Sequence, residues 1–265
     1  MKDSSAEQRE TWDQIAAGWS PDDAVETAST TPMIDFLAQL AGDGAALEFA
    51  IGTGRIGVPL ARRGVSVAGI DVSPAMVDVL HAAMPAVELP VTVGSMATAD
   101  APGRDYQLVF LIANAITCLL HQDEQIACFR NAARHLRPGG YFVIQAWVPQ
   151  LRQLPPGQSV VPATATDTLL IFDSYDLVSQ RLSCHHYNLK NGLVVSTSTS
   201  HHRYVWPSEM DVMAKMAGLE LMARYASWDR AEFTGDSYSS VSVWQKPRCA
   251  GHEKTPTTVD PGMAN

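Results

Sequence analysis

The segment Leu47–Asp71, LEFAIGTGRIGVPLARRGVSVAGID, places a glycine-rich turn between two apolar runs. Gly52, Gly54 and Gly57 follow the G-x-G-x-x-G spacing of a dinucleotide site, and Asp71 stands where a ribose-binding acid is expected. Glycine suits such a turn because backbone N–H groups can approach a ligand without intervening side chains. The segment therefore predicts a strand, a turn and a helix that bind a nucleotide-like cofactor, and a nicotinamide enzyme is the first candidate.

The rest of the chain continues the alternation of short apolar runs with helical stretches. Strands are expected at 45–50, 65–71, 87–94, 106–114, 141–147, 219–228 and 238–246. Between 150 and 206 polar and apolar residues alternate, and Asn191-Gly192 is a strong two-residue hairpin turn. This pattern predicts an α/β fold with a doubly wound, Rossmann-like sheet of seven mostly parallel strands and an antiparallel β insertion after the fifth strand. Ser73 and Pro74 are expected to begin a helix.

The composition narrows the function classes. The formal charge is -9, with no basic stripe to neutralise phosphates, so nucleic acid is not expected as a partner. No signal peptide or run of about 20 apolar residues is present, so we expect a soluble, cytoplasmic protein without a membrane partner. The four cysteines lack metal or disulfide spacing and are expected to be reduced. The two ends, 1–10 and about 248–265, have the composition of disordered segments.

Glu48 distinguishes between cofactors, because a carboxylate just before the glycine turn suits a cationic ligand group and repels a pyrophosphate. Five stretches in this order, LEFAIGTGRIG, GIDVSPAMVDVL, VGSMA, YQLVFLIANAIT and ARHLRPGGYFVI, resemble class I S-adenosylmethionine-dependent methyltransferases. The resemblance covers about residues 12–246, and more narrowly it is to bacterial small-molecule methyltransferases of specialised metabolism. It implies an N-terminal helical cap at 1–41, a methyltransferase domain at 42–247 with an acceptor-pocket insertion at about 150–206, and a disordered tail at 248–265.

The resemblance also implies the residues that bind the cofactor, S-adenosyl-L-methionine. Asp71 would accept hydrogen bonds from the ribose hydroxyls, and aromatic rings of the N-terminal segment would cover the cationic sulfonium. The implied set is Trp12, Trp19, Glu48, Ala50, Gly52, Gly54, Asp71, Val72, Met76, Gly94, Ser95, Met96 and Asn114. Ala50 and Ser95 depart from the family, which usually has glycine and often aspartate at these positions. For the two tryptophans, packing of a helix onto the sheet is the alternative role.

Residues for the acceptor are expected at the end of the fourth strand and on the insertion. Asn114, His186 and Tyr204 are the catalytic candidates, and Trp147, Tyr187 and Trp206 are candidates for an aromatic substrate wall. Cross-strand packing is the alternative for His186 and Tyr204. In an ideal hairpin turning at Asn191-Gly192, His186 shares a face with His201 and His185 with His202, offset by about 13 Å. Zinc requires about 2 Å to each nitrogen, so no metal site is predicted.

We therefore predict methyl transfer from S-adenosylmethionine to a nitrogen or carbon of a small-molecule acceptor, such as an amine or an indole. A hydroxyl acceptor would benefit from a general base, and the sequence shows no convincing base pair or metal cluster for that. An O-methyltransferase, an NAD-dependent oxidoreductase and a non-catalytic cofactor-binding regulator are the alternatives. Whether the chain forms a homodimer stays open.

Overall fold

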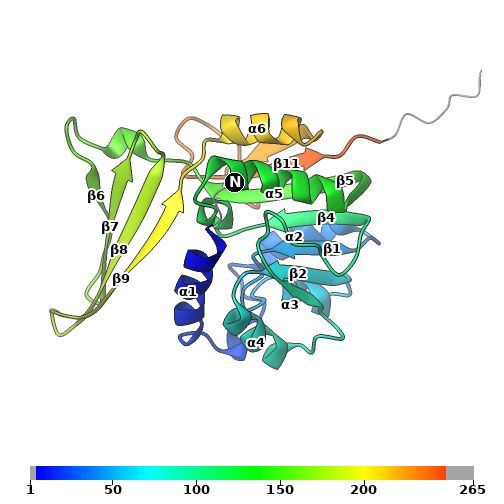
Figure 1. The fold of residues 1–265 in the computed structure, drawn as a ribbon, viewed down its shortest axis with the longest axis horizontal. Helices are drawn as coiled ribbons and strands as arrows, with labels where there is room; N and C mark the ends of the chain where they lie inside the picture. The colour runs from blue at the N-terminus through cyan, green and yellow to red at the C-terminus, as the bar shows by residue number, and fades with distance from the viewer. Residues whose placement is uncertain (1–3, 249–265) are drawn as a thin grey trace, which may run out of the picture.

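The computed structural model describes residues 4–248 and contains two separate sheets (Figure 1). The main sheet has seven strands in the order β10-β11-β5-β4-β1-β2-β3. They are β1 (Ala46–Phe49), β2 (Val67–Asp71), β3 (Val91–Val93), β4 (Tyr106–Leu111), β5 (Leu136–Trp147), β10 (Glu220–Tyr225) and β11 (Ser239–Gln245). Strands β1 to β5 pair in parallel, whereas β11 is antiparallel to both β5 and β10. The predicted doubly wound α/β sheet is confirmed.

Helices cover both faces of the main sheet. The helices are α1 (Ser5–Ala16), α2 (Thr31–Ala41), α3 (Gly57–Arg62), α4 (Pro74–Ala83), α5 (Gln122–His135) and α6 (Pro207–Met216), with short 3-10 turns η1 (Pro21–Asp23), η2 (Ala115–Cys118) and η3 (Leu151–Gln153). Along β4, Leu108 and Phe110 pack with α2, α3 and α4, while Val109 and Leu111 pack with α5 and α6. A strand buried on both faces explains why this stretch is apolar nearly throughout.

The predicted insertion forms the second sheet, in the order β6-β7-β8-β9. Its antiparallel strands are β6 (Val160–Ala165), β7 (Leu169–Asp176), β8 (Arg181–Lys190) and β9 (Leu193–Arg203). In Figure 1 this sheet stands apart from the main sheet, and α1 lies between the two. The predicted turn is confirmed, because Lys190 pairs with Leu193, and Asn191 and Gly192 have φ of 53° and 75°.

The register of the β8–β9 hairpin differs from the ideal one. A bulge between Asn188 and Leu189 shifts the pairing by one residue, so that His186 faces Ser198. Because side chains alternate along a strand, the shift places His186 on the same face as His202, and His185 on the face of His201. The predicted pairing of these histidines was therefore wrong. Within residues 4–248, no group of three or more His, Cys, Asp or Glu side chains is arranged to hold a metal ion.

The N-terminal segment is ordered from Ser4 onward, against the expectation of disorder up to residue 10. Ser4 is buried, and both its backbone N–H and its hydroxyl donate to the Glu124 carboxylate at the start of α5, at 2.7 to 2.9 Å. These hydrogen bonds fix the start of α1 against α5, although the composition of α1 is polar. The expected tail at 248–265 lies outside the described residues from 249 onward.

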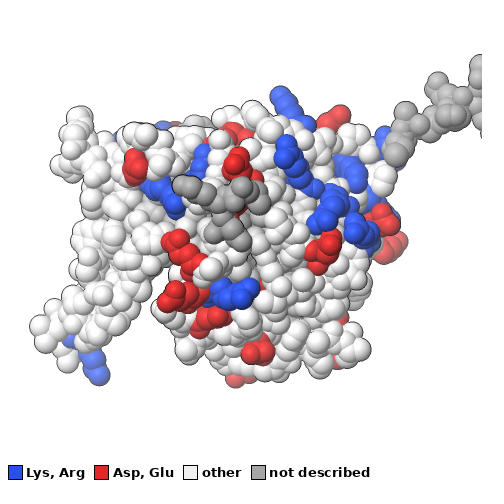
Figure 2. Space-filling model, viewed as in Figure 1, with Lys and Arg blue, Asp and Glu red and all other residues white. Residues whose placement is uncertain are grey.

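Charged side chains gather over the main domain on the face shown in Figure 2, whereas most of the second sheet's visible surface is uncharged. No helix in the described part of the chain combines the length and apolar character needed to span a bilayer.

Gly54 packs against the core, next to Val58 and Leu80. Its φ is +80°, and an added Cβ would lie 2.7 Å from Val58 Cγ2 and 3.0 Å from Leu80 Cγ. Gly64 is a matched comparison, because its φ is +90° but a Cβ added there would meet nothing within 4 Å.

We expect Gly64→Ala to lower the free energy of unfolding by about 1 to 2 kcal/mol, the cost of a left-handed alanine. Gly54→Ala should cost a further 1 to 3 kcal/mol, roughly, because the methyl group also overpacks the helix contact. Urea denaturation of both variants measures the difference. Equal losses would show that the clash at Gly54 relaxes without cost.

Candidate active site

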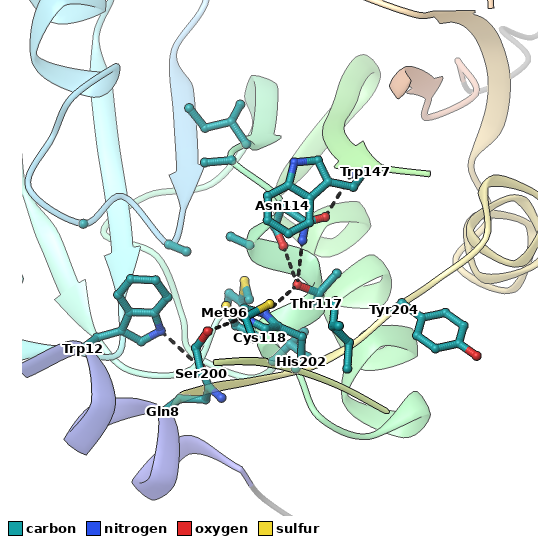
Figure 3. Close-up of a pocket in the computed structure, with 18 of the residues that line it drawn as sticks. Gln8, Trp12, Met96, Asn114, Thr117, Cys118, Trp147, Ser200, His202 and Tyr204 are labelled. Atoms are coloured by element: carbon teal, nitrogen blue, oxygen red, sulfur yellow. Dashed lines mark hydrogen bonds between the residues drawn. The ribbon is translucent and has the colours of Figure 1, made fainter. Parts of the chain in front are cut away.

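A cavity of about 830 Å³ opens at the carboxyl ends of β1 and β4. These strands are neighbours, but the chain leaves β1 toward β2 and β3 and later returns to β4 and β5 on the other side. Ligands of open parallel sheets bind at such a reversal of strand order. The inner face of the second sheet forms the opposite wall of the cavity, and α1 contributes Gln8 and Trp12 between them (Figure 3).

The residues that follow β1 and β4 at the cavity adopt left-handed backbone conformations. Ala50, just after β1, has φ of 53°, and Ala113 and Asn114, just after β4, have φ of 52° and 62°. Such conformations cost a non-glycine residue about 1 to 2 kcal/mol, and they cluster at functional sites. The positive φ of Ala50 gives a physical reason why the family usually has glycine there.

Asp71 ties the glycine turn to the end of β2. Its Oδ2 accepts a hydrogen bond from the Gly52 N–H at 2.7 Å, and its Oδ1 accepts one from the Ser73 N–H at 2.9 Å. Burial raises the pKa of Asp71, and the hydrogen bonds from the Ser73, Gly52 and Val72 backbone oppose that rise. Since a carboxylate oxygen accepts more than one hydrogen bond, Asp71 keeps acceptor capacity toward the cavity that it lines.

Glu48 is a buried carboxylate with an unpaired oxygen. Its side chain is 2% exposed, and Oε2 has no hydrogen-bond partner among the described residues. Burial raises the pKa of Glu48 well above its usual value, opposed by the charge of Arg55 and by the Gly57 N–H. A Cβ at Gly57 would lie 2.7 Å from Oε2, so glycine makes room for this carboxylate. A buried carboxylate oxygen in a cavity fits a cationic or N–H-bearing ligand group and does not fit a phosphate.

The structure brings most of the expected cofactor residues to this cavity. Those that line it are Trp12, Trp19, Glu48, Ala50, Gly52, Asp71, Val72, Met76, Gly94, Ser95, Met96 and Asn114. Gly54 is not among them, because the space around it is taken by Val58 and Leu80. Its conformation and packing, rather than ligand contact, require glycine.

Asn114 anchors a set of hydrogen bonds across the cavity (Figure 3). Its Oδ1 accepts from the Trp147 N–H at 3.0 Å, and its Nδ2 donates to Thr117 Oγ1 at 3.0 Å. Thr117 Oγ1 lies 3.0 Å from His202 Nδ1 on β9, and His202 Nε2 lies 2.9 Å from Ser200 Oγ. Both ring nitrogens of His202 are therefore engaged.

The same line continues across the second sheet. Ser200 on β9 pairs with Cys184 on β8, and Cys184 pairs with Asp173 on β7. Cys184 therefore lies between Ser200 and Asp173 on the same face of the sheet. We call this line the polar row; it consists of Asn114, Thr117, His202, Ser200, Cys184 and Asp173, and all six residues line the cavity.

The expected acceptor residues divide into two groups. His186, Tyr204 and Trp147 line the cavity. Tyr204 packs against Tyr175, with ring centroids 5.9 Å apart, and it lies apart from the polar row in Figure 3.

Tyr187 and Trp206 do not reach the cavity lining. Tyr187 faces the other side of the second sheet, where it packs edge-on against Phe172. Trp206 precedes α6 and is 38% exposed.

Sequence reasoning missed Thr117, Asp173 and the role of His202. Thr117 had no signal, because its contacts come from β9, far along the chain. Asp173 did have one: it alternates with Ile171 and Tyr175 on a strand face that is otherwise apolar, and a charged residue in that position needs an explanation.

His202 predicts a specific dependence of stability on pH. Burial, together with the charges of His201 and His186, lowers its pKa from 6.5 to about 4. As the pH falls below about 6.5 the unfolded chain takes up a proton here and the folded chain does not, so the folded state loses stability until about pH 4.

The variant His202→Gln lacks this titration. We expect the wild type to lose about 2 kcal/mol relative to the variant between pH 7 and pH 5, measured by urea denaturation at both values. A difference between the two proteins that stays constant with pH would contradict this reading of His202.

Comparison with known proteins identifies the family of the chain. A family model described as a methyltransferase domain matches residues 46–140. The CcbJ methyltransferase from Streptomyces caelestis is 35% identical, with a TM-score of 0.74 over 85% of this chain and 92% of that chain. The cypemycin N-terminal methyltransferase of a Streptomyces species is 26% identical over 207 residues, 76% of this chain and 82% of that protein. The amino pentose methyltransferase CalS10 from Micromonospora echinaspora, solved with S-adenosylmethionine bound, shares the fold at 19% identity, with a TM-score of 0.61 over 88% of this chain and 94% of that chain.

These likenesses, together with the unpaired carboxylate of Glu48 beside the glycine turn, decide against the nicotinamide alternative. The chain belongs to the S-adenosylmethionine-dependent methyltransferases.

Proposed function

We propose that this enzyme methylates a nitrogen atom of a small-molecule amine in bacterial specialised metabolism. The observation that carries the proposal is the charge of the cavity. Its lining contains three carboxylates, Glu48, Asp71 and Asp173, but only Arg55 as a cationic side chain and no lysine. A cavity lined by one sign of charge attracts ligands of the opposite sign, and amines are the common acceptors that arrive as cations.

Two titratable groups of the second sheet, His202 and Tyr175, are poorly suited to activate a hydroxyl acceptor. S-adenosylmethionine supplies the methyl group on a sulfonium, which is already an activated electrophile. The chain then has to align the acceptor and exclude water. An amine that has lost its proton to solvent attacks the methyl carbon without further activation, whereas a hydroxyl benefits from a base. His202 has both ring nitrogens engaged and a pKa lowered to about 4 by burial, and burial raises the pKa of Tyr175 to about 12, so neither is suited to that role.

The curated relative supports nitrogen as the methylated atom. By its name, the cypemycin enzyme methylates an N-terminus. An indole carbon, the other acceptor expected from the sequence, would be held by aromatic contacts and by its ring N–H, but an indole carries no positive charge to match the carboxylates of the cavity.

We assign the cofactor contacts as the family resemblance implies. Glu48 would bind the ammonium of the methionine moiety, and Asp71 the ribose hydroxyls. Met76 and Ser95 would contact the adenine, while Trp12 would cover the sulfonium from α1. The burial of the Glu48 carboxylate in the cavity lining supports the first of these assignments, since an ammonium would offset the cost of burying it.

Substitution of Asp71 tests the cofactor assignment. Because two charge-assisted hydrogen bonds are lost, Asp71→Ala should weaken S-adenosylhomocysteine binding by about a hundredfold in isothermal titration calorimetry. Asp78→Ala, which removes an exposed carboxylate on α4, is the control and should leave the affinity unchanged. Undiminished affinity in Asp71→Ala would remove the basis for placing the ribose here.

The acceptor atom can be identified even though the substrate itself is not known. The enzyme is incubated with deuteriomethyl-labelled S-adenosylmethionine and an extract of the cells that carry its gene, and heat-inactivated enzyme serves as the control. Mass spectrometry finds the labelled products, and NMR locates the label. We expect a deuteriomethyl group on nitrogen; a label on oxygen or on a ring carbon would refute the nitrogen assignment.

A further inference from the structure

Two buried side-chain polar atoms have no hydrogen-bond partner within residues 4–248, namely Glu48 Oε2 and Asp173 Oδ1. They belong to the two opposite walls of the same cavity, since Glu48 is on β1 of the main sheet and Asp173 is on β7 of the second sheet. Unpaired buried carboxylate oxygens are costly and rare in folded proteins. Glu48 is explained by the proposed cofactor contact, whereas Asp173 lies on the acceptor wall and is not.

Within residues 4–248, no lysine or arginine side chain forms an ion pair with Asp173. Arg55 is the only arginine and no lysine is present among the lining residues, and Arg55 follows β1 on the cofactor wall. His186 shares the cavity face and pairs with Ile171, one position along the same face from Asp173. His185 points to the other face, where its ring nitrogens contact Ser174 and Thr199. Burial raises the pKa of Asp173, opposed by the Cys184 thiol and by these two histidines.

Asp173 is nevertheless held in place. Its strand neighbours on the same face, Ile171 and Tyr175, pack in a small cluster with Leu182, Cys184 and Tyr204. Cys184 pairs with Asp173 across β7 and β8, and Cys184 is itself buried. The Asp173 carboxylate thus lies on an otherwise apolar strand face that lines the cavity, and its Oδ1 is buried without a hydrogen-bond partner among the described residues.

We propose that Asp173 binds the acceptor by receiving a hydrogen bond at its carboxylate from a protonated or N–H-bearing amine group. The ligand class is an amine carried on an apolar ring scaffold, because Ile171 and Tyr175 flank Asp173 on the strand face that lines the cavity. An alcohol of the same skeleton lacks the charge, and a carboxylic acid would be repelled by Asp173. The proposal rests on the proposed function, and it adds the residue that selects the acceptor.

The test compares amines with alcohols of the same skeleton. The pairs are tryptamine with tryptophol, phenethylamine with phenethyl alcohol, and cyclohexylmethylamine with cyclohexylmethanol. Binding to the S-adenosylhomocysteine-loaded enzyme at pH 7 is measured by saturation-transfer NMR and, for the best pair, by calorimetry. We expect the wild type to bind the amine at least about tenfold more tightly than its alcohol, as a hydrogen bond to a charged group allows.

Two variants assign this preference to one carboxylate. Asp173→Asn keeps the side-chain shape and removes the charge, and it should abolish the preference for amines while alcohol binding stays within about twofold. Asp167→Asn makes the same change at an exposed position of the second sheet outside the cavity, and it should keep the preference. Thermal melting of both variants establishes that they are folded.

The outcomes separate this proposal from the proposed function. Equal binding of amines and alcohols by the wild type, no binding of any amine, or a preference that survives in Asp173→Asn would each overturn the role of Asp173. A deuteriomethyl label on nitrogen, found with the cell extract, would then still stand. A label on oxygen or carbon would instead refute the nitrogen assignment, whatever Asp173 binds.

Discussion

The hydrogen bonds of the Asp71 carboxylate are the constraint on which the cavity depends. One carboxylate joins the turn after β1, through the Gly52 N–H, to the start of α4, through the Ser73 N–H. Gly52 itself has φ of +55°, so the turn adopts a conformation that only glycine enters at low cost. The strand ends, the turn and the helix start are therefore placed relative to one another before any ligand binds, which lowers the entropy that binding must overcome.

The two walls of the cavity have different origins, and the polar row connects them. The main-domain wall is made by the ends of parallel strands and is set by the fold. The acceptor wall is a separate antiparallel sheet, which contacts the main domain through η2 and β9, where Thr117 meets His202. Because Asn114 holds both Thr117 and the Trp147 backbone, the left-handed residue at the end of β4 also positions the far wall. This gives a reason for keeping a strained residue there.

Local sequence signals predicted the parts of the structure that local chemistry decides. The glycine turn, the Ser73 cap, whose hydroxyl accepts from the Met76 N–H at 3.1 Å, and the Asn191-Gly192 turn depend on nearby residues alone. The sequence did not predict that residues 4–10 are ordered, because the hydrogen bond that fixes them joins Ser4 to Glu124, 120 residues away. Gly54 was expected at the cofactor from its spacing, and its close contacts with Val58 and Leu80 are a reason for glycine that spacing alone does not show. Sequence therefore predicts most of the cofactor wall and little of the acceptor wall.

The bulge between Asn188 and Leu189 shows why the acceptor wall is hard to predict and easy to vary. A shift of one residue exchanges the two faces of a strand relative to its partner, so it decides that His202, and not His201, joins His186 at the cavity. The β7–β8 pairing is regular, so Asp173 and Cys184 keep their positions whatever happens at the bulge. Moving this one bulge would change the groups that β9 presents to the cavity without altering the main sheet. If the second sheet binds the acceptor as we propose, its strand register, and not residue identity alone, sets which groups meet that acceptor.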